Sequence, residues 1–259
     1  MGLMNIFKKP KVEFLCTHPG ALETYPIIPM KKARPKWLDL SLREYIADRA
    51  NGYPEKTIAR CPGITKLYKT GWMVYAWQDI KVKVGPHGEY DWQAKIDESR
   101  IRPGSAVVMG NHLGDTFKHS EFLSKKIPIL KLQLPWSIKI PKGYNMMQLP
   151  VPYQEHDKFT TATGVYEREF GYFELNLQLF CKGVEDEFTI EAGTPLAHLI
   201  LIKDEVVPGV VRYATKDETE EMLTITVMKA SKHMINYTNL KKAIAKVFGK
   251  GQKCPFHLG

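Results

Sequence analysis

The sequence predicts a mainly β protein, a jelly-roll or β-clip-like sandwich with a few short peripheral helices and a basic C-terminal helix. The first observation is a series of short apolar runs bounded by proline or glycine. Their spacing is that of strands in sandwiches and barrels rather than of alternating β/α units. The second is composition: the 259 residues are 44% apolar and 25% charged, which excludes a disordered protein, a collagen-like fibre and a coiled coil.

The first 60 residues are expected to form an extended segment that carries a short helix and packs on the core. Prolines at positions 19, 26, 29 and 35 disfavour helix over residues 12–36. Residues 37–50 have the apolar periodicity of a helix, with Asp39 or Ser41 as its cap and Asn51-Gly52 at its end.

The β-rich core is expected to span residues 61–228. Apolar or alternating runs at 71–77 and 79–84 predict two strands, and a turn at 85–88 leads into a third from Tyr90. The loose periodicity of residues 110–126 predicts a helix. Further apolar runs predict strands at 127–134, 136–140, 144–149, 173–180, 187–190, 196–202, 206–213 and 222–228.

The excess positive charge lies almost wholly in the last segment. The formal net charge is +9, and residues 229–259 contain seven lysines and no acidic residue. We expect a helix over residues 239–248 and an anionic partner, such as nucleic acid or an acidic protein surface. The alternative is a solvated terminal helix. The lysines expected to bind the anion are Lys241, Lys242, Lys246, Lys250 and Lys253.

Other patterns exclude whole classes of protein. No window has the roughly 20 uncharged apolar residues of a membrane span, and the apolar run at the N-terminus is too short for a signal peptide. The cysteines at positions 16, 61, 181 and 254 form no Cys-x-x-Cys pair, so neither a zinc site nor a disulfide scaffold is indicated. We expect no membrane partner, no export by a signal peptide and reduced cysteines.

An ordered series of motifs lies between residues 163 and 202. Gly164 is expected to open a turn into a hairpin that bears two carboxylates, Glu167 and Glu169, on one face, followed by Phe170. A paired strand at 173–180 and a turn at Gly193 then lead into a buried strand.

This series resembles the trimeric dUTP pyrophosphatase and dCTP deaminase superfamily, in which a Gly-apolar-apolar-Asp-x-Asp-Tyr hairpin holds the nucleoside. By this resemblance Gly164, Glu167 and Phe170 match the glycine, the first acid and the tyrosine of that hairpin. The later strand motif is matched by Gly193, Ala197 and His198. The resemblance implies a β-clip core, a homo-oligomer such as a trimer, and ligand binding at Gly164, Phe170 and His198.

Departures from that superfamily favour a protein without its activity. Its Arg-Ser-Gly phosphate-binding turn has no counterpart in residues 141–153. Glutamate in place of aspartate moves a water-activating carboxylate by about one C–C bond, and a displacement of that size can cost on the order of 100-fold in rate. Glu167 and Glu169 are therefore the catalytic candidates of an alternative, a nucleotide-binding or nucleotide-hydrolysing enzyme in which Glu167 positions water and magnesium is needed.

The whole chain also resembles a family of phage and marine-bacterial proteins. The matching segments are Glu13–Cys16, Lys31–Trp37, Cys61-Pro62 and Trp136–Tyr144. This resemblance implies a phage source and no particular activity. The function expected is that of a non-enzymatic structural or binding β-protein, without a cofactor, which acts by self-association or assembly in the virion or the host cytoplasm.

Three weaker patterns have two interpretations each. His112, Asp115 and His119 are spaced to share one helix face, where they either bind a transition metal or form plain polar surface, the simpler expectation. His198 fits a hydrogen-bonded core or interface histidine better than a catalytic base, because no partner acid or nucleophile is identifiable. Core packing, or a stacking platform for single-stranded nucleic acid, would explain Trp72, Tyr75, Trp77, Tyr90 and Trp92.

Overall fold

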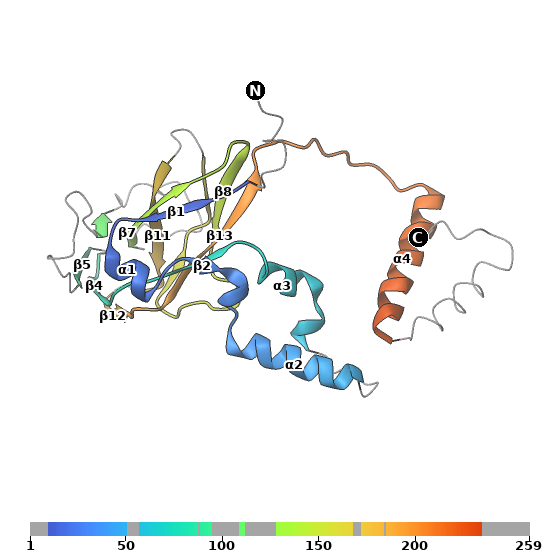
Figure 1. Ribbon diagram of the computed structural model, residues 1–259, viewed down its shortest axis with the longest axis horizontal. Helices are drawn as coiled ribbons and strands as arrows, with labels where there is room; N and C mark the ends of the chain where they lie inside the picture. Colours follow the sequence, from blue (N-terminus) through green and yellow to red (C-terminus); the bar gives the residue numbers. More distant parts are fainter. Residues whose placement is uncertain are drawn as a thin grey trace, which may run out of the picture. The chain divides into compact units, whose positions relative to one another are not determined.

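A computed structural model describes residues 10–50, 57–87, 89–94, 109–111, 128–167, 172–183 and 185–234 (Figure 1). In these ranges thirteen strands form three antiparallel sheets, which pack as a sandwich and do not close into a barrel. The predicted mainly β, sandwich-like fold is therefore confirmed. The chain divides into two compact units, residues 1–43 with 57–205 and residues 44–56 with 206–259.

The first sheet is built around two long strands, β7 (Ile129–Lys139) and β11 (Tyr172–Cys181). β1 (Glu13–Cys16) and β6 (Met109–Asn111) pair with β7, and β9 (Phe159–Thr161) pairs with β11. Buried and more exposed side chains alternate along β11, as expected for a strand with one face on the core.

β7 continues through Pro135, where the sequence predicts a break between two strands. Proline has no N–H to donate, so it disrupts a ladder unless the register shifts around it. The pairing of β7 with β11 does shift between Glu174 and Asn176, opposite this part of β7. The carbonyl of Pro135 still accepts a hydrogen bond from the N–H of Thr17 at 2.9 Å. A local irregularity thus keeps one strand where two were expected.

The second sheet has the order β10-β8-β13-β3-β2, and the third has the order β12-β4-β5. The strands of the second sheet are β2 (Ile28–Pro29), β3 (Trp72–Tyr75), β8 (Tyr144–Leu149), β10 (Gly164–Tyr166) and β13 (Pro195–Lys203). Those of the third are β4 (Ile80–Val84), β5 (Tyr90–Ala94) and β12 (Asp186–Ile190). The first 60 residues therefore contribute a strand to each five-stranded sheet.

The main core lies between the sheets and takes side chains from all three of them. Leu132 of β7, Leu177 of β11, Val82 of β4 and Leu199 of β13 are fully buried in it. Each buried leucine of this kind stabilises the fold by roughly 1.5–3 kcal/mol relative to an exposed one. The core also explains the aromatic residues of the predicted hairpin, because Trp72, Trp77, Tyr90 and Trp92 all pack against it.

A second buried cluster covers part of the outer face of the second sheet. It joins Met30 of η2 (Met30–Lys32), Leu38 of α2 (Lys36–Ala50), Ile64 of α3 (Pro62–Leu67) and Met73 of β3. The hydroxyl of Tyr68, also in this cluster, donates to the carbonyl of Pro152. The helix predicted over residues 37–50 is confirmed. Two further short helices are α1 (Pro19–Thr24) and η3 (Ile58–Arg60).

Two predicted strands are wrong. Residues 205–215 contain neither helix nor strand, and residues 222–228 belong to the helix α4 (Lys216–Met234). A capping box begins this helix, since the N–H of Thr215 donates to Glu218 Oε2 at 2.8 Å and the N–H of Glu218 lies 3.3 Å from Thr215 Oγ1. This cap, with acidic residues in the first turn, outweighs the β-branched residues that follow.

α4 also crosses the boundary predicted at residue 228, and residues 206–228 belong to the second compact unit rather than to the β core. The helix predicted over 239–248 lies outside the described residues. Of the helix predicted within 110–126, only residues 110 and 111 are described, and they belong to β6. No helix in the described ranges is long and apolar enough to cross a membrane.

Candidate functional site

The predicted hairpin at residues 164–170 is described only as far as Glu167, and its strand β10 (Gly164–Tyr166) does not pair with β11, the strand predicted to follow it. β10 pairs with β8, with Gly164 opposite Gln148 and Tyr166 opposite Met146, whereas β11 belongs to the other five-stranded sheet. Gly164 therefore lies within an edge strand and does not open a turn. Between β10 and β11 the chain passes from one sheet of the sandwich to the other.

Tyr166 links the two sheets, and sequence reasoning did not single it out. Its hydroxyl lies 2.6 Å from Gln148 Oε1 in the second sheet and 2.8 Å from the carbonyl oxygen of Asn176 in the first. Its ring stacks on Phe173 with centroids 4.5 Å apart, and burial raises its pKa. Gln148 Nε2 in turn donates to the carbonyl of Ala162 at 2.8 Å. Side chains of the protein itself thus occupy the inner side of β10.

Of the two catalytic candidates, the structure describes only Glu167. Glu167 follows β10 directly and is exposed to solvent. Glu169 and Phe170 lie outside the described residues, so the predicted pair of carboxylates on one face stays a prediction. At Gly164 an added Cβ would meet no atom within 4 Å, so this glycine is not required by close packing against described residues.

His198 is a fully buried residue of β13, with Met73 opposite it on β3 and Leu149 opposite it on β8. Its Nε2 lies 2.6 Å from the carbonyl oxygen of Thr70, so Nε2 carries the proton and donates. Burial lowers the pKa of His198, which favours the neutral ring, and the bond to Thr70 opposes this in part. The structure therefore places His198 as a hydrogen-bonded residue of the packed interior.

An outward-facing group of apolar side chains crosses three adjacent strands of the second sheet. Val165 of β10 lies opposite Met147 of β8, which lies opposite Ile200 of β13. By the alternation of side chains, Leu149 and Ile202 face the same way. We call these residues the apolar strip: Val165, Met147, Ile200, Leu149 and Ile202.

The strip faces away from the sandwich core. The chain neighbours Met146, Leu199 and Leu201 point into that core, so the residues between them point outward. The second buried cluster covers the same face at Met73, but neither cluster includes any of the five strip residues. Val165 is 49% exposed, and the other four are half-buried. Among described residues, the strip is an apolar sheet face without a covering layer.

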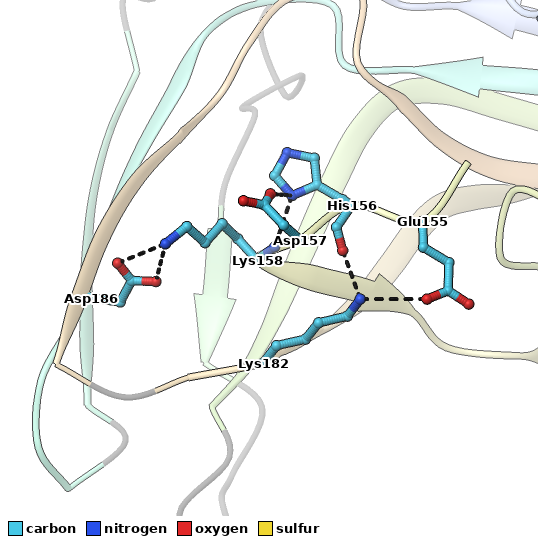
Figure 2. Close-up of polar contacts among 6 residues, drawn as sticks. All are labelled: Glu155, His156, Asp157, Lys158, Lys182 and Asp186. Carbon is cyan, nitrogen blue, oxygen red and sulfur yellow. Dashed lines mark hydrogen bonds and ion pairs between the residues drawn. The ribbon is translucent and has the colours of Figure 1, made fainter. Parts of the chain in front are cut away.

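A polar cluster joins the loop before β9 to the connection between β11 and β12 (Figure 2). Lys158 Nζ lies 2.9 and 3.2 Å from the two carboxylate oxygens of Asp186. Lys182 Nζ donates to the carbonyl of His156 at 2.7 Å and lies 3.6 Å from Glu155 Oε2. Each lysine faces a carboxylate, so the cluster holds two loops together and presents no spare positive charge to an anion.

The ring of His156 completes that cluster. Its Nδ1 accepts a hydrogen bond from the N–H of Lys158 at 3.1 Å, and the ring stacks on Phe159 with centroids 4.2 Å apart. Burial lowers the pKa of His156, although the neighbouring Asp157 carboxylate opposes the shift. The acceptor role of Nδ1 and the lowered pKa both favour the neutral imidazole. His156 is thus a structural residue of this loop.

The remaining predicted sites are not tested by the structure. The metal candidates His112, Asp115 and His119 lie outside the described residues, as do Lys241, Lys242, Lys246, Lys250 and Lys253. Within the described ranges, no group of three or more His, Cys, Asp and Glu side chains could hold a metal ion. Cys181 is buried, and burial with the nearby Asp186 raises its pKa to about 12, so its thiol is a poor nucleophile.

A scan against protein-family models and a search of curated proteins found no match to this chain. Geometry and surface chemistry are therefore the basis on which function is argued. Of the sites described above, the apolar strip is the one whose side chains face outward and belong to neither buried cluster of the described residues.

Proposed function

We propose that this protein is a non-enzymatic structural or binding β-protein that acts by self-association. The observation that carries the proposal is the apolar strip, which faces outward at the end of a sheet and belongs to neither buried cluster of the described residues. Burial of such a surface against a second copy is favourable by about 25 cal/mol per Å² of apolar area. Apolar sheet faces of this kind mark interaction surfaces.

The edge strand β10 supports the same proposal. It pairs with β8 on one side, and no described strand pairs with its other side. The backbone N–H and C=O groups of an edge strand are a template for a strand from another chain. The apolar strip and this strand edge meet at Val165, so one partner can use both.

A charge placed in the strip tests the proposal. Val165→Glu alters a side chain that is 49% exposed, so the fold should survive. Size-exclusion chromatography with light scattering should find an oligomer for the wild type and a shift toward monomer for the variant. Leu15→Glu is the matched control, since Leu15 is 42% exposed on β1 of the other five-stranded sheet and should leave the oligomer intact. A strictly monomeric wild type, or equal dissociation in both variants, contradicts the proposal.

The resemblance to phage proteins extends the proposal to assembly in a virus particle. Co-purification of the protein with mature virions is expected. Its recovery only as free protein from infected cells would count against a structural role in the particle, while leaving self-association to be judged by light scattering.

The alternative enzyme is tested separately. Nucleotide hydrolysis would use Glu167 and magnesium, yet Tyr166 and Gln148 occupy the inner side of the strand that leads to this carboxylate. We expect neither turnover nor a thermal shift with millimolar dUTP or dCTP and magnesium. Turnover that disappears in Glu167→Gln would replace the present proposal by the enzymatic one.

A further inference from the structure

We propose that residues 154–158 form a pH-sensitive switch, in which protonation of His156 exchanges one hydrogen bond for another and loosens this loop from the connection between β11 and β12. The switch lies within one chain and does not depend on self-association. Its centre is His156 Nδ1, which has two neighbours that require opposite protonation states of the ring. The N–H of Lys158 lies 3.1 Å from Nδ1, and Asp157 Oδ1 lies 3.2 Å from the same atom.

These two neighbours cannot both bond to Nδ1 in one protonation state. In the neutral ring Nδ1 accepts from the N–H of Lys158, and the proton lies on Nε2. In the protonated ring both nitrogens carry protons, so Nδ1 no longer accepts and instead donates to the Asp157 carboxylate. The side chain of Asp157 is 80% exposed, so it can turn toward the ring without disturbing packed residues.

The loop is fixed at both ends, so the exchange is confined to it. Before the loop, the carbonyl of Pro152 accepts a hydrogen bond from the hydroxyl of Tyr68. At its end, the carbonyl of Lys158 accepts one from the N–H of Lys182 at 2.8 Å. Between these two anchors, Lys182 Nζ donates to the carbonyl of His156 at 2.7 Å (Figure 2). Loss of the bond at Nδ1 thus changes residues 154–158 and leaves β9 and β11 in place.

A positive charge on His156 also weakens the contacts between the loop and the connection. Among described residues, the charged groups around it, on its own loop and on the connection, are Glu155, Asp157, Lys158, Lys182 and Asp186. The protonated ring repels the two lysines, which hold the loop through the Asp186 carboxylate and the His156 carbonyl. The exchange at Nδ1 and this repulsion act in the same direction.

The switch operates in mild acid. Burial lowers the pKa of His156 below the ordinary 6.5, the Asp157 carboxylate opposes this, and Lys182 and Lys158 lower it further. The bond to Lys158 is therefore complete above pH 6.5 and is lost as the pH falls through the lowered pKa. The ring stacks on Phe159, which is 2% exposed and stacks in turn on Phe188 of β12. Movement of His156 thus uncovers this end of the core.

Amide hydrogen exchange of the full chain, measured by mass spectrometry at pH 7.5 and 5, tests the switch. Labelling times are scaled for the pH dependence of the exchange chemistry. Protection of residues 156–158 should fall about fivefold in acid, the factor expected for the loss of one hydrogen bond. In His156→Gln the side chain stays neutral, so protection should be the same at both pH values.

His87→Gln is the matched control. It removes an exposed histidine between β4 and β5 and should leave the decrease in protection at residues 156–158 as in the wild type. No decrease in the wild type, or an equal decrease in His156→Gln, contradicts the switch.

A second measurement reads the ring itself by NMR of the chain with isotope-labelled histidine. At pH 7.5 the ring nitrogen shifts of wild-type His156 should show Nδ1 without a proton. Asp157→Asn removes the carboxylate that raises the pKa of His156, so protonation should move to lower pH. Glu155→Gln makes the same change of charge on a side chain that faces Lys182, and should move it less. A proton on Nδ1 at pH 7.5, or equal shifts in the two variants, overturns the switch.

Discussion

At the scale of single residues, hydrogen bonds determine which side chains of the second sheet are available to a ligand or partner. Tyr166 and Gln148 occupy the inner side of β10, where the Tyr166 hydroxyl lies near Gln148 Oε1 in the same sheet and near the carbonyl oxygen of Asn176 in the other. His198 is bonded to Thr70 beneath the outer face. Of the residues that suggested a nucleotide site, His198 is thus engaged by the protein. What remains exposed at this edge is Glu167 and the apolar side chain of Val165.

Among the described glycines, Gly71 is the one at which an added Cβ would come closest to another atom. Its φ is +78°, and an added Cβ would lie 2.0 Å from the carbonyl oxygen of Leu199. Gly71→Ala should lower the free energy of unfolding by about 3 kcal/mol or more, because left-handed strain adds to overlap with backbone. Gly143→Ala is the control, since its φ is +79° but no atom lies within 4 Å. It should cost only about 1–2 kcal/mol in urea unfolding; equal losses would refute the packing argument.

His198 predicts a loss of stability in mild acid. Burial lowers its pKa below the ordinary 6.5, so the folded state favours the neutral ring. Its contribution to stability is complete above pH 6.5 and is lost as the pH falls through the lowered pKa. His198→Gln, which keeps an N–H for Thr70, should flatten the decrease in melting temperature between pH 7.5 and 5. His156→Gln measures the share of the other histidine whose pKa is lowered. A slope unchanged in His198→Gln would show that the ring does not carry the effect.

At the scale of elements, local signals and long-range pairing compete along the chain. β8 and the helix at 37–50 form where the pattern predicts them. β7 continues through Pro135 because the partner strand shifts register, which no local pattern contains. Residues 222–228 have β-branched side chains but follow a capping box, and they are helical. A local pattern of side chains therefore predicts the correct helix or strand only where the helix cap or the partner strand favours the same structure.

The capping box predicts how α4 responds to mutation. The bond from Arg212 and the cap at Thr215 lower the pKa of Glu218 to about 2, so the carboxylate is charged at neutral pH and supports the first turn. Glu218→Ala should speed hydrogen exchange of the amides at the start of α4. Glu221→Ala, which makes the same change elsewhere in the helix, should not. Equal exchange in the two variants would contradict the role of the cap.

At the scale of the whole molecule, the proposed self-association depends on where apolar surface is exposed rather than on the net charge. The charge of +9 lies mainly in residues 229–259, so an anionic partner at those lysines stays a prediction separate from the sandwich. The described strands bury most of their apolar side chains in two clusters, and neither cluster includes the strip on β10, β8 and β13. Self-association is the proposal that gives this surface a use.

The sequence by itself determined the fold class and most strands of the sandwich, because alternation and turn residues are local and repeat at strand spacing. Only the tertiary structure decided that β10 and β11 belong to different sheets, that Tyr166 joins those sheets, and that Val165 and Ile200 share an outer face. Strand pairing is a long-range choice between similar edges. One residue of register reverses which side chains face the core, and no local pattern specifies that choice.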